Sequence, residues 1–307
     1  MVAAVRMDVA PRATSQPAGH LAAWRAAAAM PAMAGSFGLL LLFFGWMGRW
    51  EALALLGWLA PTAGVQTQAG ERIAVHLGCG FRRPTALQAA TLLPLWWRAL
   101  DCCALNPRDV DLYLRNTDES NAFAAGKRSV ALPTGTLSDH QAGRLADEHV
   151  VAMLVHELGH HATRGTRFAL VTTWLAAPWR FATRTLFGIV VALDRRQRLG
   201  PMATALAGGV VVAVIQSAHA GHWAVAAVLI FVSTATVLCP AADSSISRRC
   251  ELAADQYAAE AGVGADLTSA LRILRTNGPR QRRLASRLLS RHPATARRIR
   301  ALAGASN

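Results

Sequence analysis

Long apolar stretches alternate with polar ones along the chain, and their lengths predict helices. From 26 to 65 nearly every position is apolar, interrupted only by the charged and aromatic residues at 49–51. Since one membrane span takes roughly 20 residues, this length predicts two helices with the sequence GRWE as their turn. A second apolar stretch at 201–241 is divided by the short segment HAGH and predicts another pair of spans. We therefore expect about four transmembrane helices.

The region between the two apolar pairs mixes strand and helix patterns. Residues 109–117 alternate polar and apolar positions, residues 129–137 do so less regularly, and both segments predict strands. The segment 118–128 between them fits a turn or a further edge strand. After Ser138 a helical pattern continues to Gly165. These elements predict an α+β fold that is mainly helical, with a small β-sheet.

The same pattern divides the chain into six parts. The predicted parts are an N-terminal cytoplasmic segment at 1–25, a transmembrane hairpin at 26–65, a core at 66–167, a connecting helix at 168–200, a second transmembrane hairpin at 201–241 and a C-terminal portion at 242–307. The fourth part carries Arg180 and Arg184 in its middle, so we expect it to extend the helix before it and then to lie at the membrane interface.

Composition supports a membrane location. Hydrophobic residues make up 53% of the chain and charged residues 16%, and the second value lies below the roughly 25% of soluble domains. Arginines at 195–198 and at 248–249 flank the second apolar pair. The positive-inside rule then places both flanks in the cytoplasm. We expect a multi-pass protein of the cell's inner (plasma) membrane with its anchor retained.

The net charge of +14 is concentrated toward the C-terminus, where ten arginines lie between 272 and 300. No aromatic residue is interleaved with them, which disfavours the stacking surfaces of nucleic-acid binders. A basic face beside anionic lipid fits better, so the lipid bilayer is an expected partner and nucleic acid is not. The five cysteines form no CxxC pair, and we expect them to be reduced and not to bind metal.

The sequence HELGH at 156–160 carries the strongest chemical signal. Histidines four apart on a helix point about 40° apart, so His156 and His160 can reach one ion. Glu157 can face the same cleft as a general base for an attacking water, as in metalloproteases. The alternative is a helix whose histidines bond to neighbours, but burying three such groups without a purpose is costly. His161 points about 100° away from His160 and is not an expected ligand.

Two histidines leave a metal ion without its usual third protein ligand. The positions three and six residues after His160 are threonines, so the ligand has to come from further along the chain. Among the few acidic residues downstream, Glu251 and Asp255 stand four apart on one face of a predicted helix that begins after the second hairpin. We predict Glu251 as the third ligand and Asp255 as the hydrogen-bond partner of a ligand histidine. The alternative is a solvated acidic face beside two arginines.

Four motifs in this order resemble the membrane-embedded zinc metalloproteases of the HtpX and CaaX prenyl protease type, and the chain length resembles the HtpX branch. HELGH is followed by the second hairpin and then by ELAAD at 251–255. NAFAAG at 121–126 resembles the strand motif of the family, and HPATARR at 292–298 resembles its closing HP-x4-R motif. The resemblance runs from about residue 66 to the C-terminus.

The resemblance implies a gluzincin-like fold with one Zn²⁺ per chain and a catalytic site that faces the cytoplasm. It also implies roles for further residues: Asn121 aligns an extended peptide, His292 stabilises the oxyanion near the reacting carbonyl, and Arg298 belongs to the substrate-binding group. The predicted activity is that of a zinc metalloendopeptidase (EC 3.4.24 type). Its expected substrates are membrane or membrane-associated polypeptides, cleaved in protein quality control.

Three other functions stay open at this point. A regulatory sensor metalloprotease that cleaves a repressor would also pair HExxH with a downstream acid on a membrane anchor. A non-catalytic membrane scaffold would hold a structural zinc or none, although such a site has no need of Glu157. A membrane-associated nucleic-acid binder would show salt-sensitive binding through the basic C-terminal region.

Overall fold

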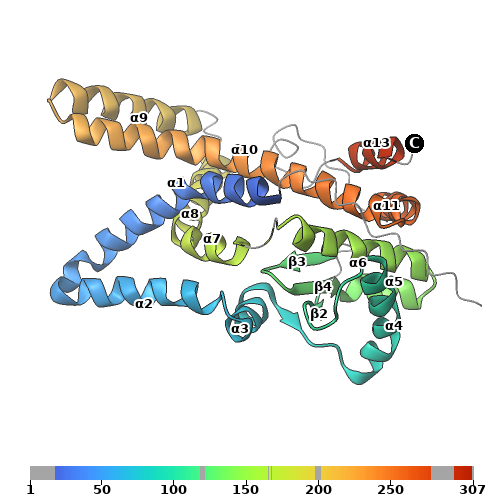
Figure 1. Cartoon of the computed structure of the whole chain (residues 1–307). Coiled ribbons are helices and arrows are strands. Elements are labelled where there is room, and N and C mark those ends of the chain that lie inside the picture. Colours follow the sequence, from blue (N-terminus) through green and yellow to red (C-terminus); the bar gives the residue numbers. More distant parts are fainter. Residues whose placement is uncertain are drawn as a thin grey trace, which may run out of the picture.

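Helices dominate the fold, and one small sheet packs among them (Figure 1). The computed structural model describes residues 18–117, 122–164, 166, 168–197, 202–277 and 294–305. Its helices are α1 (Ala18–Phe44), the 3-10 helix η1 (Gly45–Trp50), α2 (Glu51–Gly64), α3 (Gln68–Cys79), α4 (Ala86–Cys102), α5 (Thr134–Gln141), α6 (Asp147–Ala162), α7 (Ala169–Leu175), α8 (Ala177–Gln197), α9 (Met202–His219), α10 (Trp223–Glu260), α11 (Gly264–Asn277) and α13 (Thr295–Ala305). Its strands are β1 (Phe81–Arg82), β2 (Asp111–Arg115), β3 (Phe123–Ala125) and β4 (Ser129–Pro133).

The number of helices able to cross a membrane differs from the prediction. In the described part of the chain two are long and apolar enough, at Ala22–Phe44 and Trp223–Glu260, instead of four. Helix α2 has 14 residues, which gives about 21 Å against a hydrocarbon core of about 30 Å. In α9 the described apolar stretch is Gly208–His219. The predicted count was too high in the first apolar stretch because η1 occupies part of it and leaves α2 too short to span.

These two apolar helices are largely unburied in the described part of the chain. Only 17% of the apolar window in α1 and 6% of that in α10 are buried. The exposed side chains of α10 include Val228, Ile230, Phe231 and Leu238. Large apolar side chains in this arrangement call for lipid or another protein around them.

The second helix of the predicted hairpin at 201–241 is continuous with the helix expected after it. A separate helix was expected to begin after residue 241, but α10 runs unbroken through 38 residues from Trp223 to Glu260 (Figure 1). No glycine interrupts the segment 241–250, and Pro240 lies inside the helix without ending it. The same rod therefore carries an apolar half and the residues predicted to complete the site.

The sheet has the strand order β1-β2-β4-β3. Strands β2 and β4 are parallel, while β1 and β3 pair antiparallel to their neighbours. Both segments predicted as strands form them, although the second leaves the sheet after Pro133 to begin α5. The segment between them supplies β3 and a turn. Alternate side chains divide the sheet into two faces, because successive residues of a strand point to opposite sides.

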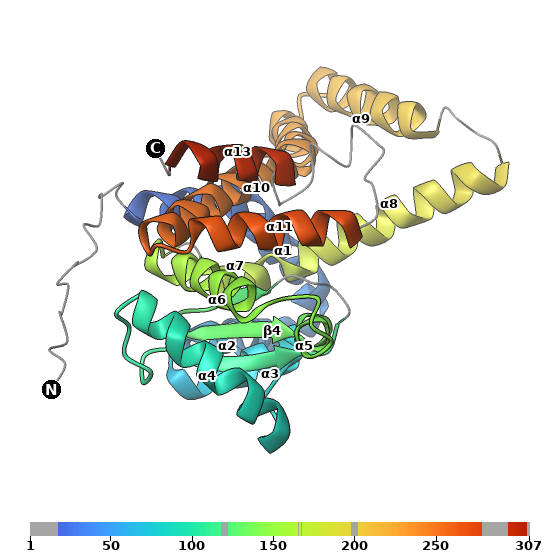
Figure 2. The ribbon, with the colours of Figure 1, turned by 90° about the vertical axis from the view of Figure 1, so that its right-hand side faces the viewer.

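One face of the sheet packs on the main core. Leu112, Leu114, Val130 and Leu132 lie in the same hydrophobic cluster as buried residues of α4 and α6. On the other face Tyr113, Ala125 and Ala131 pack with Val75 of α3 and with Phe81. Figure 2 shows α6 between the sheet and the layer formed by α10 and α11. Helix α6 is thus covered from several sides.

The predicted helix from residue 138 to 165 is in fact two helices. Helix α5 ends at Gln141 and α6 begins at Asp147, with Gly143 between them at a φ of 73°. A positive φ is the backbone conformation that glycine adopts readily, and it ends a helix. At the other end α6 stops at Ala162, and α7 and α8 follow as separate helices, so the expected extension into the connecting segment was also wrong.

Candidate metal centre

Helix α6 carries the three polar residues of the HELGH sequence in its buried interior. Every residue from Val150 to His160 is buried, and His156, Glu157 and His160 are each less than 9% exposed. One donor atom from each of these three side chains lies within 4.8 Å of the others. The imidazole rings of the two histidines have centroids 4.9 Å apart. Their helical spacing therefore brings the groups together as the sequence predicted.

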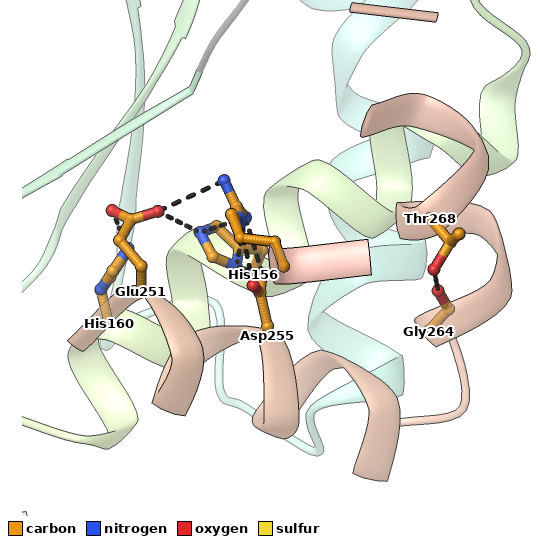
Figure 3. Close-up of polar contacts among 7 residues, drawn as sticks. His156, His160, Glu251, Asp255, Gly264 and Thr268 are labelled. Atoms are coloured by element: carbon orange, nitrogen blue, oxygen red, sulfur yellow. Dashed lines mark hydrogen bonds and ion pairs between the residues drawn. The ribbon is translucent and has the colours of Figure 1, made fainter. Parts of the chain in front are cut away.

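Glu251 of α10 faces both histidines, as Figure 3 shows. Its Oε2 lies 3.7 Å from Nε2 of His156, and its Oε1 lies 3.5 Å from Nε2 of His160. Donors around a tetrahedral zinc ion at usual bond lengths are about 3.3 Å apart. Both distances between Glu251 and the histidines are within a few tenths of an ångström of this separation, although 95 residues of sequence separate Glu251 from His156.

Asp255 lies one turn further along α10 and holds His156. Its Oδ1 is 3.0 Å from Nδ1 of His156. When the N–H group at Nδ1 donates a hydrogen bond to this carboxylate, Nε2 keeps a lone pair that can bind metal. Burial and the guanidinium of Arg298 lower the pKa of His156, but the bonds with Asp255 and Glu251 outweigh both and raise it to about 9. The carboxylates thus favour positive charge at this place.

Arg298 of α13 lies in the same cluster. Its Nε and Nη2 donate to the two carboxylate oxygens of Asp255 at 2.8 and 2.6 Å. Its Nη1 lies 3.3 Å from Oε2 of Glu251. The side chain is 5% exposed, and its donors are directed at residues of the protein. Arg298 thus contacts both acidic residues of α10, and its predicted role in substrate binding stays a prediction.

The charges of this cluster match a divalent cation. Glu157, Glu251 and Asp255 are acidic, Arg298 is basic, and the imidazoles are neutral when they act as ligands. The cluster then carries a net charge of −2, and a buried charge of this kind needs a partner. Imidazole nitrogens together with a carboxylate are a donor set that zinc uses in proteases. The residues present therefore fit the metal that the sequence predicted.

Two carboxylates compete for the place of third ligand. Glu157 lies within the group of converging donors, whereas Glu251 directs one oxygen at each histidine. Glu251 remains the predicted ligand, because one of its oxygens faces Nε2 of each histidine. Glu157 then remains available as a base, and the sequence HELGH places it on α6 without a partner that it must bind.

His161 links α6 to the sheet. Its Nε2 lies 3.2 Å from the backbone oxygen of Ser129, and its Nδ1 lies 3.2 Å from the hydroxyl of Thr166. Burial lowers the pKa of His161 to about 4, with a further contribution from His160, although bonding to the backbone opposes the shift. A neutral His161 near the end of α6 therefore connects this helix to the first residue of β4.

Gly159 is a residue whose importance the sequence reading missed. A Cβ placed on it would lie 3.1 Å from the backbone oxygen of Ala254 and from Cδ1 of Tyr257. Helices α6 and α10 can therefore approach closely only because this position has no side chain. The signal in the sequence was the glycine inside a helix, a choice that is unfavourable unless a close contact requires it.

Two predicted residues, Asn121 and His292, lie outside the residues that the structure describes. The cluster of His156, His160, Glu251, Asp255 and Arg298 is fully inside them. It joins α6, the C-terminal half of α10 and α13. Helices α6 and α10 share an extended contact.

Comparison with known proteins gives one finding. A sequence profile of peptidase family M48 matches residues 102–306, which is 205 of the 307 residues. The matched segment contains β2, α6, α10 and α13, and with them every residue of the cluster. No curated individual protein gave a significant match.

Proposed function

The chain belongs to peptidase family M48, a family of metal-dependent peptidases, and from this we propose that it is a zinc endopeptidase of a cell membrane. The observation that carries the proposal is the pair of contacts between Glu251 and the Nε2 atoms of His156 and His160. A scaffold helix has no reason to bury these groups with a net negative charge. A metal-dependent active site has such a reason, because the bound cation offsets the negative charge.

In this proposal each residue of the cluster has its own role in peptide hydrolysis. A zinc ion held by His156, His160 and Glu251 would polarise the scissile carbonyl and make the attacking water more acidic. Glu157 accepts the proton of that water and passes it to the nitrogen of the leaving amine. Asp255 keeps His156 in the tautomer that binds metal, and Arg298 keeps Asp255 and Glu251 in place.

The exposed apolar helices support a membrane location. Side chains along α1 and the first half of α10 are large, apolar and unburied. Arg195, Arg196 and Arg198 come before the apolar stretch at 201–241, and Arg248 and Arg249 come after it, which favours a catalytic site on the cytoplasmic side. Substrates in reach of such a site are membrane or membrane-associated polypeptides, and quality control is the role that we propose. In this proposal Asn121 aligns the peptide and His292 stabilises the oxyanion.

The test compares Glu157→Gln with the wild type and with Glu148→Gln, purified in detergent. Glu148 is on the same helix, and its side chain is 54% exposed. We expect about one zinc per chain in all three proteins, by elemental analysis. Cleavage of an unfolded fluorescent reporter protein should fall roughly 10²- to 10⁴-fold in Glu157→Gln and stay unchanged in Glu148→Gln. Zinc without cleavage in the wild type would point to a scaffold, and equal cleavage by all three would remove Glu157 from the mechanism.

A further inference from the structure

Glu71 is a buried carboxylate that the proposed mechanism does not use. It lies in the first turn of α3 and is 3% exposed. Its Oε2 accepts a hydrogen bond from the backbone N–H of Lys127 at 3.0 Å. Its Oε1 accepts one from the backbone N–H of Arg128 at 3.0 Å and one from the hydroxyl of Ser129 at 2.8 Å. Three successive residues of one turn therefore bind the two oxygens of this side chain.

The turn is built around the carboxylate. Gly126 begins it with a φ of 63°, a conformation that glycine takes without strain. A Cβ at this position would lie 2.5 Å from Cδ of Glu71, so even alanine would push the carboxylate away. Successive backbone N–H groups after a residue in this conformation form a concave binding site for anions. Here the anion is supplied by the protein itself, from 55 residues earlier in the chain.

The opposite side of the same turn is held by α6, the helix that carries His156 and His160 and is called the metal helix below. His161 directly follows the predicted ligand His160, and its Nε2 contacts the backbone oxygen of Ser129. Ser129 thus bonds to α3 through its hydroxyl and to α6 through its carbonyl. The turn 126–129 is clamped between the two helices.

The strand at the edge of the sheet, β3, ends directly before this turn, and β4 begins at its end. In the described part of the chain β3 pairs with β4 alone, in the register Phe123 with Ala131 and Ala125 with Ser129. A shift at Ser129 would therefore be passed on to β3. Strand β3 also contacts α6, so its free edge lies beside the helix that carries the metal-binding histidines. An extended peptide can add to such an edge through backbone hydrogen bonds.

We propose that Glu71 is a positioning residue that fixes the edge strand β3 relative to the metal helix, so that an extended substrate pairs with β3 at the height required for cleavage. This inference rests on the proposed function. Glu71 belongs to the segment that follows α2 directly, so its carboxylate is one of the links between that segment and the turn next to β3. A glutamine in its place accepts at one position but opposes a donor with its amide group at the other.

The experiment measures cleavage of two peptides by the full chain in detergent. One peptide is long enough to pair along β3, and the other is a short reporter that contains only the residues on either side of the cut bond. For Glu71→Gln we expect kcat/KM on the long peptide to fall roughly 10- to 100-fold, mainly through KM. The short reporter should change less than about threefold, and the zinc content should stay at the wild-type level.

Two further variants complete the test. Glu148→Gln makes the same chemical change at an exposed position and should behave like the wild type on both peptides. Ser129→Ala removes only the hydroxyl bond to Glu71 and should show the same selective loss to a smaller degree, and it carries the test if Glu71→Gln does not fold. Binding of the long peptide in a Glu157→Gln background, by fluorescence anisotropy, should weaken in parallel.

The outcomes separate this inference from the proposed function. An equal loss on both peptides, or no loss, would overturn the positioning role while leaving the peptidase intact. Absence of cleavage of either peptide by the wild type would overturn the proposed function itself. Unchanged binding of the long peptide by Glu71→Gln would also contradict the inference.

Discussion

The two halves of α10 differ in which side chains they expose and which they bury. In the first half, 223–240, large apolar side chains such as Val228 and Phe231 are more than half exposed. In the second half the charged residues Glu251 and Asp255 are buried, at 7% and 1% exposure. A soluble helix would show the reverse of both, with apolar residues inside and charges outside. One continuous helix therefore lies in two different surroundings.

The difference shows what each half requires from its neighbours. The polar half is stable only because every buried charge has a partner: Asp255 has His156 and Arg298, and Glu251 has both histidines and Arg298. The apolar half needs no specific partner, only surroundings without water. Substitutions should consequently have large and specific effects around the polar half and small effects in the apolar half.

The largest effect is expected for Arg298→Met. This change removes the cation that neutralises Asp255 and leaves buried carboxylates unpaired, which typically destabilises a protein by about 3–5 kcal/mol. Arg297→Met is the matched control, since the neighbouring Arg297 is exposed and its removal should change the free energy of unfolding by less than about 0.5 kcal/mol. Denaturant unfolding of metal-free protein in detergent measures both. Equal stabilities would show that the cluster does not depend on this ion pair.

The next effect is a dependence on pH that belongs to the polar surroundings of α6. The folded-state pKa of His161 is about 4, and that of an unfolded histidine is about 6.5. The unfolded chain therefore takes up the proton first as the pH falls, so stability present above pH 6.5 is lost between pH 6.5 and 4. His161 is partly exposed, which reduces the expected loss to about 1–3 kcal/mol.

The measurement for this pH effect is a series of unfolding curves for metal-free wild type and His161→Gln. The variant stays neutral at every pH, so the stability difference between the two proteins should change across this window and be constant above it. Parallel curves from pH 7 to 4 would mean that His161 is not buried in its neutral form.

A smaller effect is expected for Asp255→Asn. The amide can still contact His156 but no longer carries the charge that favours the metal-binding tautomer, so zinc affinity should fall about 10- to 100-fold. Competition with a zinc chelator measures the affinity. The neighbouring exposed Gln256 supplies the control, because Gln256→Ala leaves the cluster untouched. Equal zinc affinity in all three proteins would remove Asp255 from the metal site.

Local patterns could be predicted from the sequence, whereas the arrangement of distant elements could not. The spacing of His156, Glu157 and His160 on one helix follows from helix geometry, and the four-residue spacing of Glu251 and Asp255 predicts a shared face. The α+β composition and two of the strands also followed from periodicity. The pairing of Glu251 with the histidines came from counting candidate acids, and the structure brings these side chains together.

Contacts that depend on three-dimensional packing left no such pattern. Arg298 is one of ten arginines between 272 and 300, and its sequence neighbours do not show that it is buried against Asp255. Glu71 is a single acid in the first turn of a helix, where acids are common because of the helix dipole. The number of spans was misjudged for a related reason: apolar length is visible in the sequence, but the position where each helix ends depends on turns such as the one at Gly48.

The smallest effect compares one substitution in the two surroundings, and it tests the contrast most directly. Gly159→Ala places a Cβ within 3.1 Å of α10, so the helices have to separate, which typically costs about 1–3 kcal/mol. In α9, beside the apolar half of α10, Gly209 has open space around it. There alanine should stabilise by up to about 1 kcal/mol, because glycine is the poorer helix former. Thermal unfolding in detergent gives both signs, and zinc affinity should fall in Gly159→Ala alone, since Glu251 moves with α10. Two changes of the same sign would mean that the approach of α6 and α10 is not set by Gly159, and the polar half would then tolerate change as the apolar half does.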